Sequence, residues 1–226
     1  MALKGTMIEM TMGDGAKIGV YHVEAQGARR GGLVLIQEIF GVTDHIKECC
    51  DSFAGEGYEV LAPALYDREA PGLQADYTPE DVQKCIKVAR EQHPFDLSVK
   101  DSQTCIDALK NKGPVFITGY CYGGSVTWAA VCRCEGLAAG SGYYGSLIPA
   151  LSGETPKCPV ILHFGEHDHG IPMDGIEKVK AAHPDVPVYI YDAGHGFNSD
   201  RRADYNEAAA KLARQRTLEL FRANGG

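Results

Sequence analysis

Several signatures that define broad protein classes are missing from this sequence of 226 residues. Its first residues, 1–6, contain no apolar core, so we expect no secretion signal. No apolar run approaches the length that a membrane-spanning helix needs. The sequence has no H-E-x-x-H pair, no C-x-x-C pair and no phosphate-binding G-x-x-x-x-G-K-[ST] loop. These absences argue against a membrane span, a zinc motif and a nucleotide-binding P-loop.

Basic residues are fewer than acidic ones: the sequence has 22 Lys and Arg and 30 Asp and Glu, which gives a net charge of −8. This charge argues against nucleic acid or an anionic membrane surface as a partner. A hydrophobic content of 44% and a charged content of 23% are typical of a soluble globular protein. The length fits a single domain over residues 1–226, and no repeat, low-complexity tract or linker interrupts it.

Cysteine is plentiful, with 8 residues, but a disulfide framework is not indicated. The chain is long, has no recognisable secretion signal and shows no regular cysteine spacing, so reduced thiols in a cytosolic compartment are expected. Most of these cysteines are expected to be small core residues. The exception is Cys121, whose sequence context is different.

Apolar runs that suit buried strands alternate with amphipathic segments that suit helices. We expect strands over residues 6–12, 16–23, 33–36, 58–62, 114–118, 137–144, 159–164 and 186–191. We expect helices over residues 43–56, 78–92, 97–111, 125–131, 172–183 and 202–223. This alternation predicts an α/β fold, with a mostly parallel sheet flanked by helices and an antiparallel hairpin at the N-terminus. The irregular stretch 64–80 is long enough to suggest a functional or mobile loop.

The stretch G-Y-C-Y-G-G at 119–124 lies between an expected strand and an expected helix. A G-x-nucleophile-x-G turn in this context is the nucleophile elbow of α/β-hydrolases. Its glycines are needed because a Cβ at either flanking position would strike the neighbouring strand or helix. The central residue here is Cys121 rather than the usual serine. The alternative is a buried cysteine in a glycine-rich turn.

Four expected strands end in segments that carry Glu38, Cys121, Asp168 and His195. Sites in such sheets form at the carboxyl ends of the strands, so the fold should bring these residues together. Cys121, Asp168 and His195 also follow the chain order nucleophile, acid, histidine. We therefore expect a triad in which the histidine is the base for the thiol and the aspartate orients the histidine.

The triad needs hydrogen-bond donors for the negative oxygen of the reacting substrate. We expect the backbone N–H groups of Tyr122 and Ile39 to form this oxyanion hole. Asp168 could instead be an ordinary turn residue, with Glu166, Asp174 and Asp192 as weaker candidates for the acid.

A metal site is the alternative for the histidine-rich segment that contains His163, His167, Asp168 and His169. Residues 167–169 are neighbours, so their side chains cannot all point the same way. We expect no metal, and the proposed chemistry needs no cofactor.

Six segments resemble the dienelactone hydrolase (carboxymethylenebutenolidase) family. They are Q-E-I-F-G-V at 37–42, L-Y-D-R-E-A-P-G at 65–72, G-Y-C-Y-G-G at 119–124, G-Y-Y-G at 142–145, F-G-E-H-D at 164–168 and G-H-G-F at 194–197. The resemblance implies an α/β-hydrolase with little or no lid that opens cyclic enol-lactones. It also implies that Glu38 contacts the resting cysteine and takes its proton when substrate binds. A strand-end salt bridge is the alternative for Glu38.

The substrate-reading region departs from the family pattern. A dienelactone carries a carboxylate, which calls for a cationic anchor. The best-known members have an Arg with aromatics in the helix after the 64–78 loop, and residues 81–88 have neither. The remaining candidate anchors, each of which could equally be a surface charge, are Arg68, Lys84, Arg201 and Arg202. Tyr144 is a candidate pocket wall, with a purely core role as the alternative.

The sequence thus predicts a hydrolase that cleaves a small, anionic lactone or ester through a cysteine nucleophile and a thioester. A dienelactone-type enol-lactone is the favoured substrate. A general short-chain esterase or thioesterase is the second possibility, and a non-catalytic binding protein that keeps the fold is the third. Family membership favours a monomer.

Overall fold

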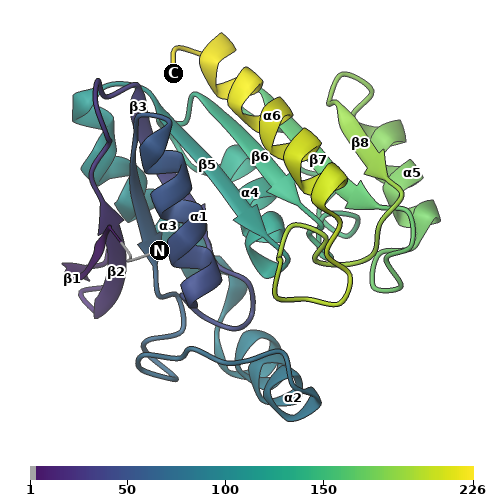
Figure 1. Cartoon of the computed structure of the whole chain (residues 1–226), viewed down its shortest axis with the longest axis horizontal. Helices are drawn as coiled ribbons and strands as arrows, with labels where there is room; N and C mark the ends of the chain where they lie inside the picture. The colour runs from purple at the N-terminus through teal and green to yellow at the C-terminus, as the bar shows by residue number, and fades with distance from the viewer. Residues whose placement is uncertain (1–3) are drawn as a thin grey trace.

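Eight strands form one sheet in the order β1-β2-β4-β3-β5-β6-β7-β8 (Figure 1). The computed structural model describes residues 4–226. Residues 1–3, which belong to the segment considered above for a secretion signal, lie outside the described residues. The strands are β1 (Thr6–Thr11), β2 (Lys17–Val23), β3 (Gly31–Ile36), β4 (Tyr58–Pro63), β5 (Val115–Tyr120), β6 (Ala139–Tyr143), β7 (Val160–Gly165) and β8 (Val188–Tyr191).

Strand directions confirm the predicted architecture. The pairs β1–β2 and β2–β4 are antiparallel, and every later pair from β4–β3 to β7–β8 is parallel. The five central strands β3 to β7 are buried along their whole length. Such strands have helices on both faces, which is why their sequences are continuous apolar runs rather than alternating ones.

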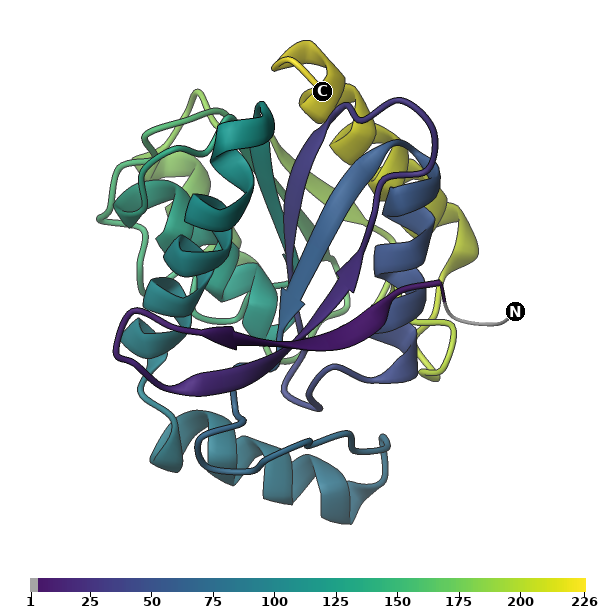
Figure 2. The ribbon, with the colours of Figure 1, turned by 90° about the vertical axis from the view of Figure 1, so that its left-hand side faces the viewer.

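Helices cover both faces of the sheet. They are α1 (Asp44–Gly55), α2 (Pro79–Lys87), α3 (Phe95–Leu109), α4 (Tyr122–Arg133), α5 (Met173–Ala182) and α6 (Glu207–Ala223). Two short turns of other helix types, η1 (Val88–Gln92) and η2 (Lys110–Lys112), extend α2 and α3. Figures 1 and 2 place α1 and α6 on one face and α3, α4 and α5 on the other. Among residues 4–226, no helix is both long and apolar enough to cross a membrane.

The segment between β4 and α3 lies at the end of the sheet toward which β4 points, and there α2 stands away from the main body (Figure 2). Most of residues 64–78 are turns and bends, as expected from their composition. Thr78 caps α2, because its side chain accepts a hydrogen bond from the N–H of Asp81. The expected helix over 78–92 is therefore present, but its last turn, η1, is a π-helix.

The last helix is shorter than predicted. It begins at Glu207 rather than at residue 202, because the side chain of Asn206 accepts a hydrogen bond from the N–H of Ala209 and starts the helix there. The preceding residues 201–204 form turns beside the strand ends. This correction matters for the site, because it places Arg202 in a loop rather than on a helix face.

One glycine-rich segment has the spacing of a dinucleotide-binding turn but not its structure. Residues 140–145 read G-S-G-Y-Y-G, which matches G-x-G-x-x-G. The first four of these residues belong to β6, whereas the binding motif requires a turn that opens a helix. The segment is therefore a strand of the core.

Candidate active site

The predicted elbow joins β5 directly to α4, with Cys121 as the connecting residue. Cys121 has φ 56° and ψ −115°, a strained conformation for a residue other than glycine. A Cβ on Gly119 would lie 2.3 Å from the carbonyl oxygen of Gly123, and one on Gly123 would lie 2.4 Å from that of Ile36. Real atoms cannot approach so closely, so the glycines are required, as the sequence predicts.

A methyl group at Gly123 should therefore be costly. We expect Gly123→Ala to lower the free energy of unfolding by about 1–3 kcal/mol, because the backbone of β3 must move to admit the Cβ. Urea unfolding measures this change. Gly153→Ala is the matched control, since nothing lies within 4 Å of its added Cβ, and its effect should stay within about 0.5 kcal/mol. Equal effects of the two substitutions would show that the turn is not tightly packed.

The three residues expected to form a triad are in contact. The Nε2 atom of His195 lies 3.2 Å from the Sγ atom of Cys121, and its Nδ1 atom lies 2.6 Å from Oδ2 of Asp168. Asp168 follows β7 and His195 follows β8, so the strand ends bring them to the elbow. The second oxygen of the Asp168 carboxylate accepts a hydrogen bond of 2.8 Å from the N–H of Gly170. One oxygen of the acid thus contacts the histidine, and the other fixes the carboxylate itself.

Charges around His195 favour its protonated form. Burial alone lowers the pKa of this imidazole, but the negative charge of the Cys121 thiolate and the hydrogen bonds to Asp168 and Cys121 outweigh it. Together they raise the pKa of His195 to about 10. An imidazolium at His195 places a positive charge 3.2 Å from the Sγ atom of Cys121.

Two backbone N–H groups are the candidates for the oxyanion hole. Tyr122 is the first residue of α4, so its N–H has no acceptor within the helix. The N–H of Ile39, after β3, takes part in none of the backbone hydrogen bonds found outside helices and strands among residues 4–226. Their binding of an oxyanion stays a prediction.

Glu38 is at the same edge of the sheet, but its recorded contacts are not with the thiol. Its carboxylate is fully buried, and Oε2 accepts a hydrogen bond of 2.9 Å from the hydroxyl of Tyr77. Its Oε1 atom has no hydrogen bond within the described chain and lies 3.7 Å from Nη1 of Arg202. Sequence reasoning missed Tyr77, although it lies in the 64–80 stretch that composition marks as functional.

Two of the candidate cationic anchors are already engaged by carboxylates. Arg68 donates hydrogen bonds to both oxygens of Asp101 and both oxygens of Asp14, at 2.7 to 3.0 Å. Arg201 donates to both oxygens of Glu48, at 2.8 and 2.9 Å. These partners leave neither guanidinium free to bind a substrate carboxylate.

Arg202 differs from these two arginines. Its side chain is 20% exposed, and it makes no hydrogen bond to another residue of the range 4–226 beyond its ion pair with Glu38. A Cβ on Gly196 would lie 2.6 Å from its Nε atom, so the guanidinium lies across the residue that follows His195. Arg202 is thus a cation with unused donors near His195.

Tyr144 lies in the core beside His195. Its ring packs edge-on against His195, with 5.2 Å between the ring centroids. The side chain is fully buried, and its hydroxyl has no hydrogen-bond partner within residues 4–226. Its φ of 36° is unusual for a residue other than glycine.

A second triad-like arrangement, with a serine in place of the cysteine, contacts Tyr122 of the elbow. His93 contacts Glu69 through Nδ1 and Ser98 through Nε2, both at 2.9 Å. The hydroxyl of Ser98 also lies 2.8 Å from that of Tyr122. Ser98 is fully buried in the first turn of α3. The order of contacts is that of a triad, but the hydroxyl is enclosed.

The residues considered for a metal site have separate partners. His163 is buried in β7 and contacts the hydroxyls of Tyr191 and Ser141, at 2.8 and 3.1 Å. The exposed His167 contacts Asp192 at 2.6 Å, whereas Asp168 contacts His195. The group does not converge on one point.

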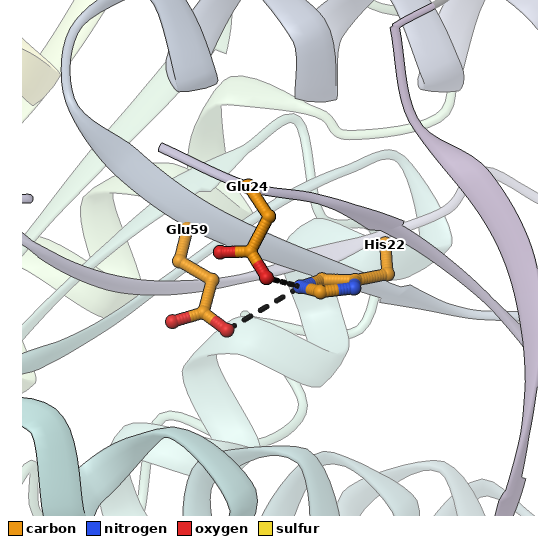
Figure 3. A group of neighbouring side chains, drawn as sticks. All are labelled: His22, Glu24 and Glu59. Atoms are coloured by element: carbon orange, nitrogen blue, oxygen red, sulfur yellow. Dashed lines mark hydrogen bonds and ion pairs between the residues drawn. The ribbon is translucent and has the colours of Figure 1, made fainter. Parts of the chain in front are cut away.

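Another group, His22, Glu24 and Glu59, brings an imidazole and two carboxylates together (Figure 3). It lies on β2 and at the beginning of β4, away from the carboxyl ends of the parallel strands. Arg29 and Lys112 also bind the Glu59 carboxylate, at 2.8 and 3.0 Å. These cations already neutralise the Glu59 carboxylate, so the group is an ion-pair network.

Comparisons with known proteins agree with the geometry. The model of the "Dienelactone hydrolase family" matches residues 18–225. A Salmonella typhimurium protein named "Putative carboxymethylenebutenolidase" is 35% identical over 219 residues, which cover 86% of this chain and 77% of that protein. "Carboxymethylenebutenolidase 1" of Cupriavidus pinatubonensis is 29% identical and is matched over 95% of both chains. A crystal structure described as a putative dienelactone hydrolase from Klebsiella pneumoniae superposes with a TM-score of 0.82 at 27% sequence identity. The match covers 96% of this chain and 98% of that one.

Proposed function

The chain belongs to the dienelactone hydrolase family of α/β-hydrolases, and on that premise we propose that it opens a small anionic enol-lactone of the dienelactone type through a thioester on Cys121. The observation that carries the proposal is the line of contacts from Asp168 through His195 to the sulfur of Cys121, at 2.6 and 3.2 Å. The strained elbow presents this sulfur at the start of α4, where the helix dipole favours negative charge.

The first half of the reaction forms the thioester. The thiolate of Cys121 attacks the lactone carbonyl carbon, a C–S bond forms, and the carbonyl oxygen becomes an oxyanion that the N–H groups of Ile39 and Tyr122 bind. When this intermediate collapses, the ring C–O bond breaks, and His195 gives its proton to the leaving oxygen. The product stays attached as an acyl group.

The second half releases the acid. His195 has lost its proton and now takes one from a water molecule, which attacks the thioester carbon. The C–S bond breaks, the open acid leaves, and the thiolate and imidazolium are restored. Asp168 stabilises the imidazolium in both halves through its short hydrogen bond. One chain supplies every group in this scheme, so a monomer suffices for activity.

Glu38 regulates the protonation of the thiol in this proposal. Its contacts with Tyr77 and Arg202 support a conformation in which it is turned away from the sulfur, leaving Cys121 paired with His195. If Glu38 turned toward the sulfur, its negative charge would disfavour a thiolate and keep the thiol neutral.

Arg202 is the proposed anchor for the substrate carboxylate. We expect Arg202→Met to lower kcat/KM for an anionic lactone by about 10- to 100-fold, since a hydrogen bond to a charged group contributes about 1.5–3 kcal/mol. An uncharged ester such as p-nitrophenyl acetate should lose clearly less, because it has no carboxylate for Arg202 and is affected only through the ion pair with Glu38. Steady-state kinetics with both substrates measures the difference.

Arg201→Met is the matched control for this variant, because Arg201 is adjacent in sequence but engaged by Glu48. It should leave both substrates almost unaffected. Equal losses on the anionic and the uncharged substrate in Arg202→Met would contradict the anchor. Kinetics on the wild-type enzyme also tests the substrate class. A kcat/KM for p-nitrophenyl acetate above that for dienelactone would favour a general esterase.

Ser98 is the second candidate nucleophile, because its contact with His93 and Glu69 has the connectivity of a triad. Two observations weigh against it. Its hydroxyl is buried, and it already contacts the hydroxyl of Tyr122. The elbow thiol has neither of these disadvantages.

A further inference from the structure

A second thiol lies beside a histidine and a carboxylate outside the catalytic triad. His45 and Cys49 are four residues apart on α1 and therefore share one face of the helix. The Sγ atom of Cys49 lies 3.7 Å from Nε2 of His45. The other ring nitrogen, Nδ1, lies 3.6 Å from a carboxylate oxygen of Asp200. The imidazole thus has the same two kinds of partner as His195, at longer distances.

The surroundings of His45 favour the imidazolium form. Its side chain is 6% exposed, and this burial alone lowers its pKa. The negative charge of Cys49, the hydrogen bond to that sulfur, and the charges of Glu38 and Asp200 outweigh burial and raise the pKa of His45 to about 9. Glu38 is fully buried, and its Oε1 lacks a hydrogen bond within residues 4–226, so its charge is not screened by solvent.

Cys49 is also accessible, unlike its neighbour. It is partly exposed, whereas Cys50 is 0% exposed and burial raises the pKa of that thiol well above its ordinary value. Cys158 is partly exposed too, but burial raises its pKa to about 11, and it has no hydrogen bond to a histidine within residues 4–226. Cys49 is the partly exposed thiol that combines access with a cationic partner and is not part of the triad.

From this cluster we infer that Cys49 is a second activated thiol and a modification site for soft carbon electrophiles, such as α,β-unsaturated carbonyl compounds. Access and a neighbouring cation are the two conditions for a reactive cysteine. Acyl transfer is not its chemistry, because Cys49 lies inside α1, where the backbone N–H groups are committed to the helix and cannot bind an oxyanion. Addition to an activated alkene needs no oxyanion hole of this kind.

The proposed reaction is a conjugate addition. The thiolate of Cys49 forms a C–S bond to the β-carbon of the electrophile, and the electron pair of the C=C bond moves to the α-carbon as an enolate. The imidazolium of His45 then gives its proton to the α-carbon. No leaving group or oxidant is required, and the product is a thioether with a neutral His45.

The test uses N-ethylmaleimide as the electrophile and the full-length Cys121→Ala protein, so that the catalytic thiol is absent. At pH 7, peptide mass spectrometry against time should show Cys49 labelled at least tenfold faster than Cys158. His45→Gln in the same background should reduce the labelling rate of Cys49 at least tenfold and leave that of Cys158 unchanged. Asp200→Asn should have a smaller effect, because the Asp200 side chain is 61% exposed.

Two results would overturn the inference: labelling of Cys49 no faster than that of Cys158, or an unchanged rate at Cys49 in His45→Gln. Cys158 also reports on folding, because a protein opened by the substitution would label Cys158 and the buried Cys50 faster as well. If that occurs, His45→Asn and His45→Phe are measured at a temperature where Cys50 stays protected. A failure here leaves the proposed hydrolase untouched, since Cys49 takes no part in it.

Discussion

Cys121→Ala is expected to lower kcat/KM for the lactone by about 10⁴-fold or more, since loss of a nucleophile leaves only binding and oxyanion stabilisation. The strained φ of 56° at this position is imposed by the turn between β5 and α4, so the fold should persist without the thiol. Circular dichroism checks the fold, and steady-state kinetics gives the loss. A thioester trapped by acid quench and detected at Cys121 by mass spectrometry would identify the attacking atom directly.

Ser98→Ala is the control that decides between the two candidate nucleophiles. This substitution removes a hydroxyl from the contact with His93 and Tyr122, so we expect some loss of stability and no more than about a tenfold loss in kcat/KM. The opposite pattern, with activity kept in Cys121→Ala and abolished in a folded Ser98→Ala protein, would assign the chemistry to the serine and reject the proposed mechanism.

Asp168→Asn should have the second largest effect, with kcat reduced by about 10³- to 10⁴-fold. The amide can no longer accept a charged hydrogen bond from Nδ1, so the histidine is held in the wrong tautomer. The pH profile should change as well. Because Asp168 is one cause of the raised pKa of His195, its removal lowers that pKa.

The sign of the pH effect follows from the role of His195 as a proton donor. Wild-type kcat should stay high below pH 10 and fall as His195 loses its proton near its pKa of about 10. In Asp168→Asn this alkaline limb should move toward lower pH by about 1 unit or more. Asp192→Asn is the matched control, because Asp192 contacts the exposed His167 and should move neither kcat nor the limb. An unmoved limb in Asp168→Asn would show that another group controls it.

Much of this site is predictable because its signals are local in the sequence. The two glycines around Cys121 mark a turn that only a strand and a helix in close contact require. Asp168 follows the buried strand β7 and His195 follows the partly buried strand β8, and the rule that sites form at the carboxyl ends of parallel strands brings them together. Neither inference needs knowledge of side-chain conformation.

The choice among the cations could not be made from sequence, because it depends on tertiary partners. In the sequence, Arg68 and Arg202 are equally suitable as anchors for a substrate carboxylate. Only their contacts in the structure show that Arg68 is engaged by two carboxylates and that Arg202 has unused donors. The contact between Tyr77 and Glu38 joins residues 39 positions apart and leaves no periodic signal. The start of α6 was misplaced because the polar residues 202–206 suit a helix as well as a turn.

The contacts of Arg68 have a consequence for protein engineering. This one guanidinium joins Asp14, in the turn of the N-terminal hairpin, to Asp101 on α3, and it does so from the segment that also carries Tyr77. The edge hairpin is therefore tied through this arginine to the segment that contacts Glu38. Tags, truncations or circular permutations at this hairpin, although far from Cys121 along the chain, should therefore also disturb the contact between Tyr77 and Glu38.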